Sequence, residues 1–408
     1  MNGVPVSRMG REPRKERIAG DYRPAAVVLS SIVASHGAAV EEMHGGDMTN
    51  RREFLSKAAA TVGLGASLRA EQRPAAMPTP RAAALMNAFG LKYPIFNAGM
   101  GMAASPELAI AVSNAGGLGA IGTGTRLSGA ARADVVRQLV ARTKAGTARP
   151  FAVNFLLAVE PQTLPAALDA GAPIIQFAWG IPSADTLAAV RRAGAKMGIQ
   201  VASAAGARRA LDAGADYLIC QGTEAGGHVQ SSNALYEALP AVVDEAKSVP
   251  VLAAGGIATG AHIRRALLAG ASGVLVGTRF VATKEAWAHT EYKDAIVRAN
   301  AGDSVLTVCF QDGWPNAPHG VLRNRTFNMW EAAGCPPPGK RPGEGETVST
   351  DVAGVMRRRY SGAWPTPDER GELLELALYA GKGVGAIRDI PSAADLTARL
   401  WKECIDAP

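Results

Sequence analysis

The sequence predicts an α/β fold, specifically a (β/α)8 TIM barrel with a short C-terminal helical extension. Three observations predict it: the chain has 408 residues, short apolar runs alternate with Ala-rich helical patterns from Tyr93 onward, and these runs number eight. Continuous apolar runs indicate strands buried on both faces of a parallel sheet, and eight βα repeats are typical of a barrel of roughly 250 residues. An open, doubly wound sheet is the alternative, because local patterns do not show whether a sheet closes.

The eight apolar runs are the predicted strands. They cover residues 94–98, 118–122, 151–157, 174–179, 197–202, 217–221, 249–253 and 273–277. Helical patterns lie between several of them, at residues 106–115, 184–193, 205–213 and 261–269. Gly214 and Gly270 follow two of these patterns, and glycine ends a helix readily because it adopts the left-handed conformation at little cost. We interpret these two glycines as αβ turns.

Composition divides the chain into five parts. Residues 1–47 are polar and irregular, which predicts a disordered extension that translation from Met48 would omit. Residues 48–76 are predicted to be an export signal, residues 85–330 the barrel, and residues 371–408 C-terminal helices that pack on it. Residues 331–370 are rich in Pro and Gly, which predicts either an insertion of no consequence or a lid over the barrel mouth.

The predicted signal resembles the twin-arginine type. Arg51 and Arg52 precede Phe54 and Leu55, and a weakly apolar stretch of small residues follows at 58–66. Such signals are addresses for the export machinery, so we expect a periplasmic or exported protein, and a cytoplasmic one if the signal is not used. A disordered basic tail is the alternative interpretation.

Charge and cysteine content exclude several classes of function. Lys+Arg 43 against Asp+Glu 36 gives a net charge of +7, but no basic block with interleaved aromatic residues occurs, so we expect no nucleic-acid partner. No apolar run reaches the roughly 18–20 residues of a spanning helix, so we expect no stable membrane insertion. The four cysteines are far apart and form no CxxC pair, so no metal site is predicted.

Two glycine-containing strand ends predict a phosphate site. In a barrel, functional residues lie at the carboxyl ends of the strands, and phosphates commonly bind after strands seven and eight. Gly255-Gly256 follows the seventh predicted strand, and Gly277-Thr278 follows the eighth. Glycines let backbone N–H groups approach an anion, and the Thr278 hydroxyl adds a donor. The alternative is that these glycines only turn the chain.

His228 is the candidate catalytic residue. It follows the sixth predicted strand, directly after Gly226-Gly227, and it is the only histidine at a predicted strand end. An imidazole near its unperturbed pKa can take a proton from an acidic carbon at neutral pH. The alternative is a surface histidine or a satisfied core histidine. Glu224, in the same loop, is expected to brace the turn by accepting backbone hydrogen bonds.

Together these segments resemble the nitronate monooxygenase family, formerly called 2-nitropropane dioxygenases. The resemblance covers residues 85–403, and its most specific part is the run Gln221-Gly222-Thr223-Glu224-Ala225-Gly226-Gly227-His228. The other matching pieces are Tyr93-Pro94-Ile95-Phe96, Ala115-Gly116-Gly117-Leu118-Gly119, Val153-Asn154-Phe155, Ala253-Ala254-Gly255-Gly256-Ile257, Gly277-Thr278-Arg279-Phe280 and Tyr379-Ala380-Gly381-Lys382-Gly383-Val384-Gly385.

The resemblance implies an FMN-dependent barrel enzyme that oxidises alkyl nitronates with molecular oxygen to a carbonyl compound and nitrite. It implies that His228 is the base, which either removes the α-proton of a nitroalkane or steadies an anionic nitronate. It also implies that FMN contacts Asn154, Gln221, Gly226, Gly255, Gly256, Gly277 and Thr278. Trp179 is bulkier than expected at the end of the fourth predicted strand, so we expect an altered pocket.

Three other functions stay open. An FMN-dependent enoyl reductase shares the barrel and a similar Glu-Ala-Gly-Gly-His run, and an NAD(P)H:quinone reductase uses the same fold. The third is a barrel that binds FMN or another phosphate ligand as a carrier or sensor. Flavin reduction by a nicotinamide cofactor would favour a reductase, whereas absence of any turnover would favour the carrier.

Overall fold

The computed structural model describes residues 77–124, 129–158 and 162–408. The predicted extension at 1–47 and the predicted signal at 48–76 lie outside the described residues. The first described helix, α2 (Pro80–Phe89), begins ahead of the expected barrel start at residue 85. Thr79 caps this helix, because its hydroxyl oxygen accepts a hydrogen bond from the Ala82 N–H at 3.3 Å.

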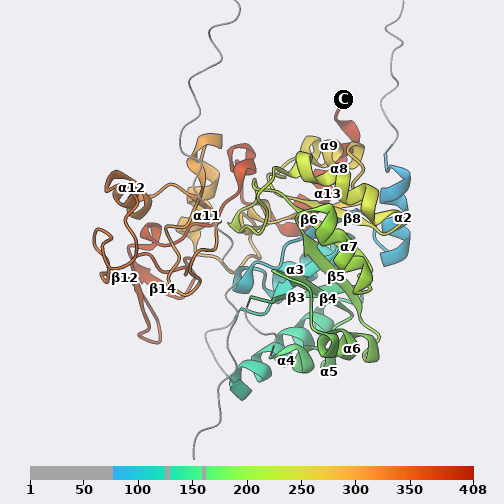
Figure 1. The fold of residues 1–408 in the computed structure, drawn as a ribbon, viewed down its shortest axis with the longest axis horizontal. Coiled ribbons are helices and arrows are strands. Elements are labelled where there is room, and N and C mark those ends of the chain that lie inside the picture. The colour runs from blue at the N-terminus through green and yellow to red at the C-terminus, as the bar shows by residue number, and fades with distance from the viewer. Residues whose placement is uncertain (1–76, 125–128, 159–161) are drawn as a thin grey trace, which may run out of the picture. The chain divides into compact units, whose positions relative to one another are not determined.

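Eight parallel strands form the barrel (Figure 1), and each overlaps one of the predicted apolar runs. Their order around the sheet is β1-β9-β8-β6-β5-β4-β3-β2, and a parallel bridge between Phe96 and Leu118 joins β1 to β2. The (β/α)8 prediction is therefore confirmed, and the open-sheet alternative is wrong. The strands are β1 (Ile95–Asn97), β2 (Gly119–Gly122), β3 (Phe151–Leu156), β4 (Ile174–Ala178), β5 (Lys196–Val201), β6 (Tyr217–Gln221), β8 (Val251–Ala254) and β9 (Gly273–Val276).

Helices cover the outside of the strands. Several begin with a hydroxyl cap, as in α3, where Ser105 Oγ accepts a hydrogen bond from the Leu108 N–H at 3.2 Å. Gly214 and Gly270, near the ends of α7 and α9, have φ of +85° and +97°, as predicted for turn glycines. The helices are α3 (Pro106–Ala115), α4 (Gly129–Gly146), α5 (Leu164–Asp169), α6 (Ala184–Arg192), α7 (Ala204–Asp212), α8 (Leu235–Ala246) and α9 (Gly260–Leu268).

Helix α2 closes the amino end of the barrel. Its residues Leu85 and Phe89 join a buried cluster with Phe96, Tyr217 and Leu252, which come from three different strands. The rings of Phe89 and Tyr217 pack edge to face with centroids 5.5 Å apart. Side chains therefore fill the amino end of the barrel, so a binding site is expected at the carboxyl ends of the strands.

The eighth helix of the barrel is α13 (Ala393–Asp406), which lies far along the chain from the eighth strand. It packs against both α3 and α9 and so completes the ring of helices. Residues 282–392, which we call the insert, separate the last barrel strand from this helix. The predicted C-terminal helices at 371–408 consist of α13 and two 3₁₀ turns, Leu373–Glu375 and Lys382–Ala386.

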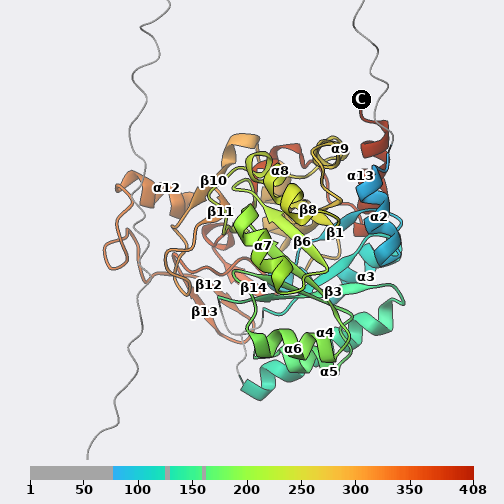
Figure 2. The ribbon, with the colours of Figure 1, turned by 45° about the vertical axis from the view of Figure 1, so that its right-hand side comes forward.

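The insert contains two small antiparallel sheets. In the first, β11 (His319–Leu322) pairs with β10 (Ser304–Thr307) and with β7 (Gly227–His228), which belongs to the loop after β6. The second contains β12 (Thr347–Asp351), β13 (Met356–Arg358) and β14 (Glu369–Gly371). Figure 2 shows the strands β10 to β14 together on one side of the barrel. The remaining elements are α10 (Thr278–Val281), α11 (Thr290–Arg298), α12 (Arg325–Ala332) and the 3₁₀ turns Gly101–Ala103 and Ala301–Asp303.

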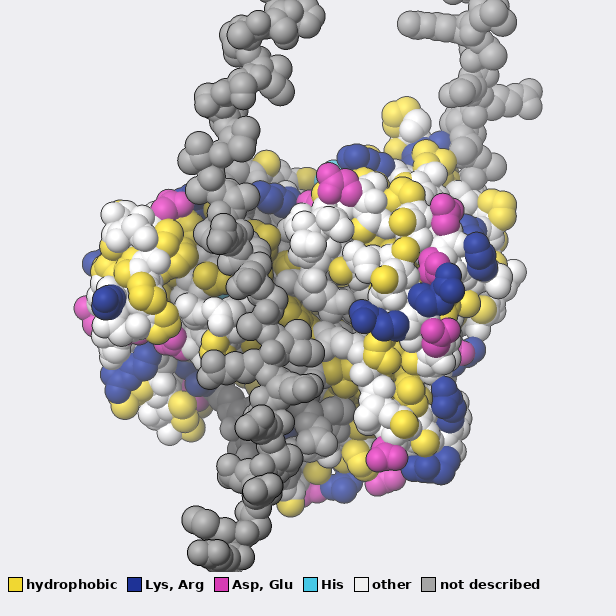
Figure 3. Space-filling model, viewed as in Figure 1, with side chains coloured by type: hydrophobic (Ala, Val, Ile, Leu, Met, Phe, Trp, Pro, Cys, Tyr) yellow, Lys and Arg dark blue, Asp and Glu magenta, His cyan; other side chains and the backbone are white. Residues whose placement is uncertain are grey.

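Basic and acidic side chains are interspersed on the face shown in Figure 3, and the described residues there form no broad patch of one sign. In the described part of the chain, no helix is long and apolar enough to cross a membrane. The same residues contain no group of three His, Cys, Asp or Glu side chains placed to hold a metal ion.

Candidate active site

A cavity of about 490 Å³ lies at the carboxyl ends of the barrel strands. Its wall includes residues that end or follow the strands, such as Ala98, Ala178 and Ala254, and also residues of the insert, such as Phe310. The strand ends thus meet at one place, as the barrel prediction requires. All eight predicted site residues line this cavity: Asn154, Gln221, Gly226, His228, Gly255, Gly256, Gly277 and Thr278.

One side of the cavity, which we call the glycine side, consists of Gly255, Gly256, Gly277 and Thr278. Gly255 and Gly256 follow β8 with φ of +119° and +69°, a region that L side chains adopt only under strain. A Cβ atom on Gly256 would also lie 3.1 Å from Glu224 Cβ. These conformations leave backbone uncovered next to the cavity, which suits close approach by an anion such as phosphate.

The insert is hydrogen-bonded to the glycine side and to the neighbouring loop after β6. The Gly381 N–H donates to Thr278 Oγ1 at 3.0 Å, and the Lys382 N–H donates to the Glu224 carbonyl at 2.9 Å. A Cβ atom on Gly226 would lie 2.6 Å from Gly381 N, so this backbone contact requires glycine. The position of Gly381 was not predicted as part of the site, although it lies in a recognised motif.

Glu224 braces the loop after β6, as the sequence predicts. Its Oε2 accepts a hydrogen bond from the Leu235 N–H at 2.9 Å, at the first residue of α8. Asn154 plays a comparable role on the opposite strands, because its Nδ2 donates to the Gly99 carbonyl at 3.3 Å. Both side chains therefore hold neighbouring loops in place.

Two glutamines fix the loop that carries the candidate catalytic histidine. Gln221 Nε2 donates to the His228 carbonyl at 3.3 Å, and its Oε1 accepts from the Gln230 N–H at 3.0 Å. Gln230 in turn accepts from the Trp179 N–H at 2.8 Å and donates to the Gln200 carbonyl at 3.0 Å. Gln221 therefore acts on the backbone of the loop, and Gln230 is a supporting residue that the sequence analysis missed.

The imidazole of His228 is enclosed by aromatic rings. Trp314 stacks on it with centroids 4.2 Å apart and planes 23° apart, and the rings of His319 and Tyr379 lie at 5.3 and 5.6 Å. Burial, and secondarily His319, lower the pKa of His228 to about 3, so it is neutral at pH 7. Its Nε2 is buried and has no hydrogen-bond partner among the described residues. Nε2 therefore lacks the hydrogen bond that a buried ring nitrogen normally makes.

His319 is a second histidine at the site. It is fully buried and pairs directly with His228 in the β11–β7 register. Its Nδ1 lies 2.9 Å from the Ala317 carbonyl, and its Nε2 accepts from the Phe310 N–H at 3.2 Å. These contacts select the neutral tautomer protonated at Nδ1, and burial lowers the pKa of His319 as well.

A second part of the cavity wall is made of large aromatic side chains instead of glycines. We call it the aromatic side, and it consists of Trp179, Trp314, Trp364 and Tyr379. Trp179 and Trp314 lie with ring centroids 4.8 Å apart, so the bulky residue that the sequence placed at the fourth strand end does line the pocket. Trp364 Nε1 is buried and has no partner among the described residues. Because Trp364 belongs to the segment 331–370, that segment reaches the cavity.

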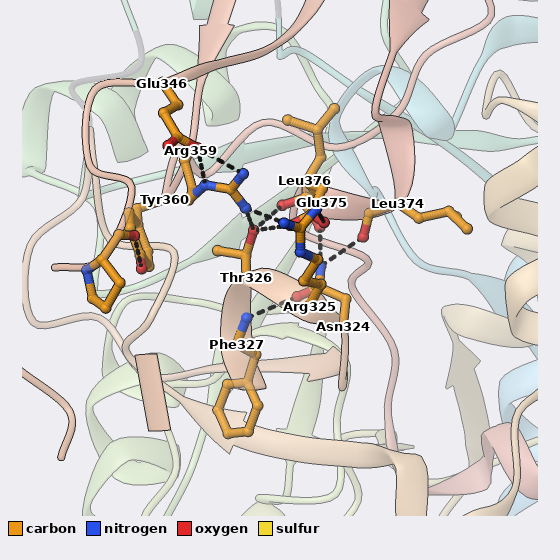
Figure 4. A network of polar contacts seen from close by, with 11 residues as sticks. Asn324, Arg325, Thr326, Phe327, Glu346, Arg359, Tyr360, Leu374, Glu375 and Leu376 are labelled. Atoms are coloured by element: carbon orange, nitrogen blue, oxygen red, sulfur yellow. Dashed lines mark hydrogen bonds and ion pairs between the residues drawn. The ribbon is translucent and has the colours of Figure 1, made fainter. Parts of the chain in front are cut away.

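A buried ion-pair network anchors the aromatic side (Figure 4). Arg359 contacts Glu375 and also Glu346, which accepts from Arg359 Nη2 at 2.9 Å. The Thr326 hydroxyl donates to Glu375 Oε2 at 2.6 Å. Arg359 precedes Trp364 by five residues, and Glu375 precedes Tyr379 by four. The network therefore fixes the two chain segments that carry these aromatic residues into the cavity wall.

The charged residues that line the cavity, among those described, are Arg132 and Asp312. Asp312 Oδ1 accepts from Arg341 Nη2 at 2.8 Å, so its charge is paired. Arg132, on α4, has a buried Nε without a hydrogen-bond partner among the described residues. The cavity therefore suits an anionic ligand.

Comparison with known proteins agrees with this geometry. Residues 82–167 and 160–403 match the sequence profile of the family described as nitronate monooxygenase. The nitronate monooxygenase of Paraburkholderia phytofirmans is 29% identical over 367 residues, which cover 78% of this chain and 94% of that protein. The structure of nitroalkane oxidase from Streptomyces ansochromogenes has a TM-score of 0.62 at 28% identity and covers 79% of this chain and 98% of that one. FabK from Thermotoga maritima has a TM-score of 0.65 at 28% identity, with coverage of 79% and 96%.

Proposed function

Because the chain belongs to the nitronate monooxygenase family, and is therefore a flavin-dependent oxidoreductase, we propose that it uses FMN and molecular oxygen to oxidise alkyl nitronates to a carbonyl compound and nitrite. The observation that supports this reaction is the unpartnered Nε2 of His228. It is buried and makes no hydrogen bond with the described residues, and His228 lines the same cavity as the glycine side. A ligand that accepts or donates one hydrogen bond would satisfy it.

FMN fits the residues that line the cavity. Its phosphate suits the glycine side, whose four residues carry no acidic side chain; the acidic residue of the cavity wall, Asp312, belongs to the insert. When bound, the flavin supplies the redox chemistry, and the protein supplies binding, orientation and electrostatics. We propose that FMN is held by Asn154, Gln221, Gly226, Gly255, Gly256, Gly277 and Thr278.

The protonation state of His228 favours a nitronate anion over a neutral nitroalkane as the substrate. A base with a pKa of about 3 removes a carbon-bound proton slowly at neutral pH. A nitronate has already lost that proton and needs only to be held beside Nε2. Arg132 complements its negative charge. His228 then orients the anion, and the role of base toward a neutral nitroalkane is the less favoured of the two.

Reduction of an enoyl thioester or a quinone by a nicotinamide cofactor is the alternative, because the FabK enoyl reductase matches this chain as well as nitroalkane oxidase does. An anaerobic titration separates the two functions. The visible spectrum of the purified flavoprotein is recorded after addition of propane-2-nitronate, of neutral 2-nitropropane, or of NADH. We expect the nitronate to bleach the flavin, 2-nitropropane to bleach it much more slowly, and NADH to leave it unchanged. Rapid bleaching by NADH alone would move the assignment to a reductase.

Substitution of His228 tests its role. We expect His228→Asn to lower nitronate turnover by about 10²-fold or more, while the flavin content of the purified protein is kept. The control is His289→Asn, because His289 caps α11 by accepting from the Glu291 N–H at 3.2 Å, and asparagine caps helices equally well. Wild-type turnover in His228→Asn would show that this imidazole is not needed.

We also propose export through the twin-arginine signal at 48–76. The pair Arg51-Arg52 followed by Phe54-Leu55 supports this location. Cell fractionation of the full chain and of its Arg51→Lys, Arg52→Lys double variant tests it. Export of the wild type, with retention of the double variant in the cytoplasm, is expected; equal distribution of both would contradict it.

A further inference from the structure

We propose that the natural substrate carries a flat apolar group, aromatic or conjugated, which packs against Trp314. This inference rests on the proposed function, because it names the substrate class of the same site. Trp314 is then a specificity-determining residue, and His228 and the flavin act on the nitronate end of the substrate.

The first observation is where this chain places its tryptophans. Aromatic residues make up only 5% of the sequence, with six tryptophans in all, yet Trp179, Trp314 and Trp364 line one cavity. Trp330 and Trp401, by contrast, are buried in the core at 8% exposure. The three cavity tryptophans are only partly buried, and each contributes to the cavity wall, although Trp364 also packs against a buried apolar cluster.

The second observation is that Trp314 is held in place by polar contacts. The neighbouring Asp312 accepts from Arg341, whose side chain is only 2% exposed, and the Arg341 guanidinium lies 4.4 Å above the ring of Tyr360. The Asn316 N–H donates to Gln311 Oε1 at 3.1 Å on the other side of the loop. A cavity wall fixed in this way loses little conformational entropy when a ligand binds, so it is suited to recognition.

The third observation is that Trp179 is retained in an unfavourable conformation. Its φ of +68° is uncommon for a bulky residue, and the Gln230 side chain stabilises it through the Trp179 N–H. Strain of this kind is typical of functional sites. It places the Trp179 ring at 4.8 Å and 56° from Trp314, within the range in which aromatic rings attract one another.

A flat group is favoured over an aliphatic one of the same size because aromatic rings attract each other beyond the area that they bury. The cavity lining can contact both ends of such a substrate. The indole rings would contact its apolar group, and Arg132 and His228, whose Nε2 has no hydrogen-bond partner among the described residues, would contact its anionic end. Trp314 already stacks on His228, so the flat group would pack against the part of the indole that borders the cavity.

The test compares two carboxylates that resemble a nitronate anion and are not oxidised, phenylacetate and cyclohexylacetate. They differ in the flatness of the ring, and the cyclohexyl ring is the more apolar, so hydrophobicity alone would favour it. Binding to the full-length flavoprotein is followed by the perturbation of the flavin absorbance. We expect phenylacetate to bind about three- to tenfold more tightly. Equal affinities, or tighter cyclohexylacetate, would overturn the inference.

Two variants locate the preference. Trp314→Leu is expected to remove most of it, whereas Trp314→Phe, which keeps a flat ring, is expected to keep it. A preference unchanged in Trp314→Leu would show that Trp314 does not determine specificity. If Trp314→Leu does not fold, the wild type and Trp314→Phe still decide the question, because equal affinities in the wild type are sufficient to reject it.

Failure of this inference can be distinguished from failure of the proposed function. Nitronate oxidation without a preference for phenylacetate would leave the function and reject the substrate class. Preference for phenylacetate without oxidation of any nitronate, including that of phenylnitromethane, would support the flat-ligand site and reject nitronate oxidation.

Discussion

The glycine side of the cavity is made of backbone, whereas the aromatic side is made of large side chains that buried ion pairs hold in place. Gly255, Gly256 and Gly277 follow neighbouring barrel strands directly, so the barrel itself sets their positions. Trp314 and Trp364 come from the insert, and their positions depend on contacts such as those of Arg341 and Arg359.

This difference teaches how one fold accommodates different substrates. The side that suits a common phosphate-bearing ligand is built into the barrel and changes little with side-chain identity. The side proposed to meet the substrate is built on long connections between elements, which tolerate sequence change more readily than strands do. The first side should be sensitive to changes in backbone conformation, and the second to loss of buried charge partners.

The largest effect is expected from breaking the ion pair that anchors the aromatic side. Arg359 and Glu375 have side chains only 6% and 7% exposed, and removal of Arg359 leaves the buried Glu375 with only the exposed Arg325, 3.6 Å away, as a cationic partner. We expect Arg359→Met to lower the free energy of unfolding by about 3 kcal/mol. Urea denaturation measures this change, and limited proteolysis shows whether cleavage falls within the insert.

The matched control for this prediction is Arg323→Met, also in the insert. Arg323 and Glu331 form an ion pair with side chains 39% and 46% exposed, and exposed pairs contribute about 0–1 kcal/mol. A similar loss of stability in both variants would mean that the buried network has no special role in anchoring the aromatic side.

A smaller effect, on the opposite side of the cavity, is expected from Gly256→Ala. The φ of +69° and the 3.1 Å approach to Glu224 Cβ mean that alanine must shift the local backbone. We expect flavin affinity to fall about tenfold, which corresponds to about 1.4 kcal/mol, as measured by fluorescence titration of the apoprotein with FMN.

Gly194→Ala is the control for conformational strain. Gly194 has a similar φ of +66°, and nothing lies within 4 Å of the added Cβ, but it is not among the residues that line the cavity. We expect this variant to lose some stability and to bind flavin normally. Equal loss of flavin affinity in both variants would show that the effect is global and does not arise at the glycine side.

The same division explains what could be predicted from the sequence. Each barrel strand is a short apolar run, and the glycine side follows two of these runs directly, so local patterns located both. His228 was found in the same way, because it follows β6 by a few residues. Only the ends of the elements differ, as in β5, which begins at Lys196 and not at residue 197.

Trp179 of the aromatic side follows β4 directly and was located in the same way, but the part of that side that comes from the insert depends on pairing between distant segments. His319 lies beside His228 only because β11 pairs antiparallel with β7. One signal was present: Gly227-His228 and His319-Gly320 are the same dipeptide in opposite order, so antiparallel pairing matches His with His and Gly with Gly. Trp314 lies in a loop that Arg341 holds through Asp312, which is 29 positions away in the sequence, and no local pattern encodes that contact.

A pH unit below 6.5 is expected to change stability by less than either substitution does. This dependence sharpens the comparison because His228 lies on a barrel loop but is buried by residues of the insert. Its pKa is lowered from 6.5 to about 3 in the folded protein. Between these values the unfolded chain binds a proton that the folded chain does not, so stability must fall as the pH falls through this window.

Comparison with His228→Asn isolates this contribution, because the variant lacks the titrating group and retains the other histidines. Relative to the variant, we expect the wild type to lose about 1 kcal/mol of stability for each pH unit below 6.5, as measured by urea denaturation from pH 7 to pH 4. Above pH 6.5 the difference between the two proteins is expected to be constant. A difference that does not change with pH would mean that the imidazole titrates normally, and therefore that Trp314, His319 and Tyr379 do not keep it from water in solution.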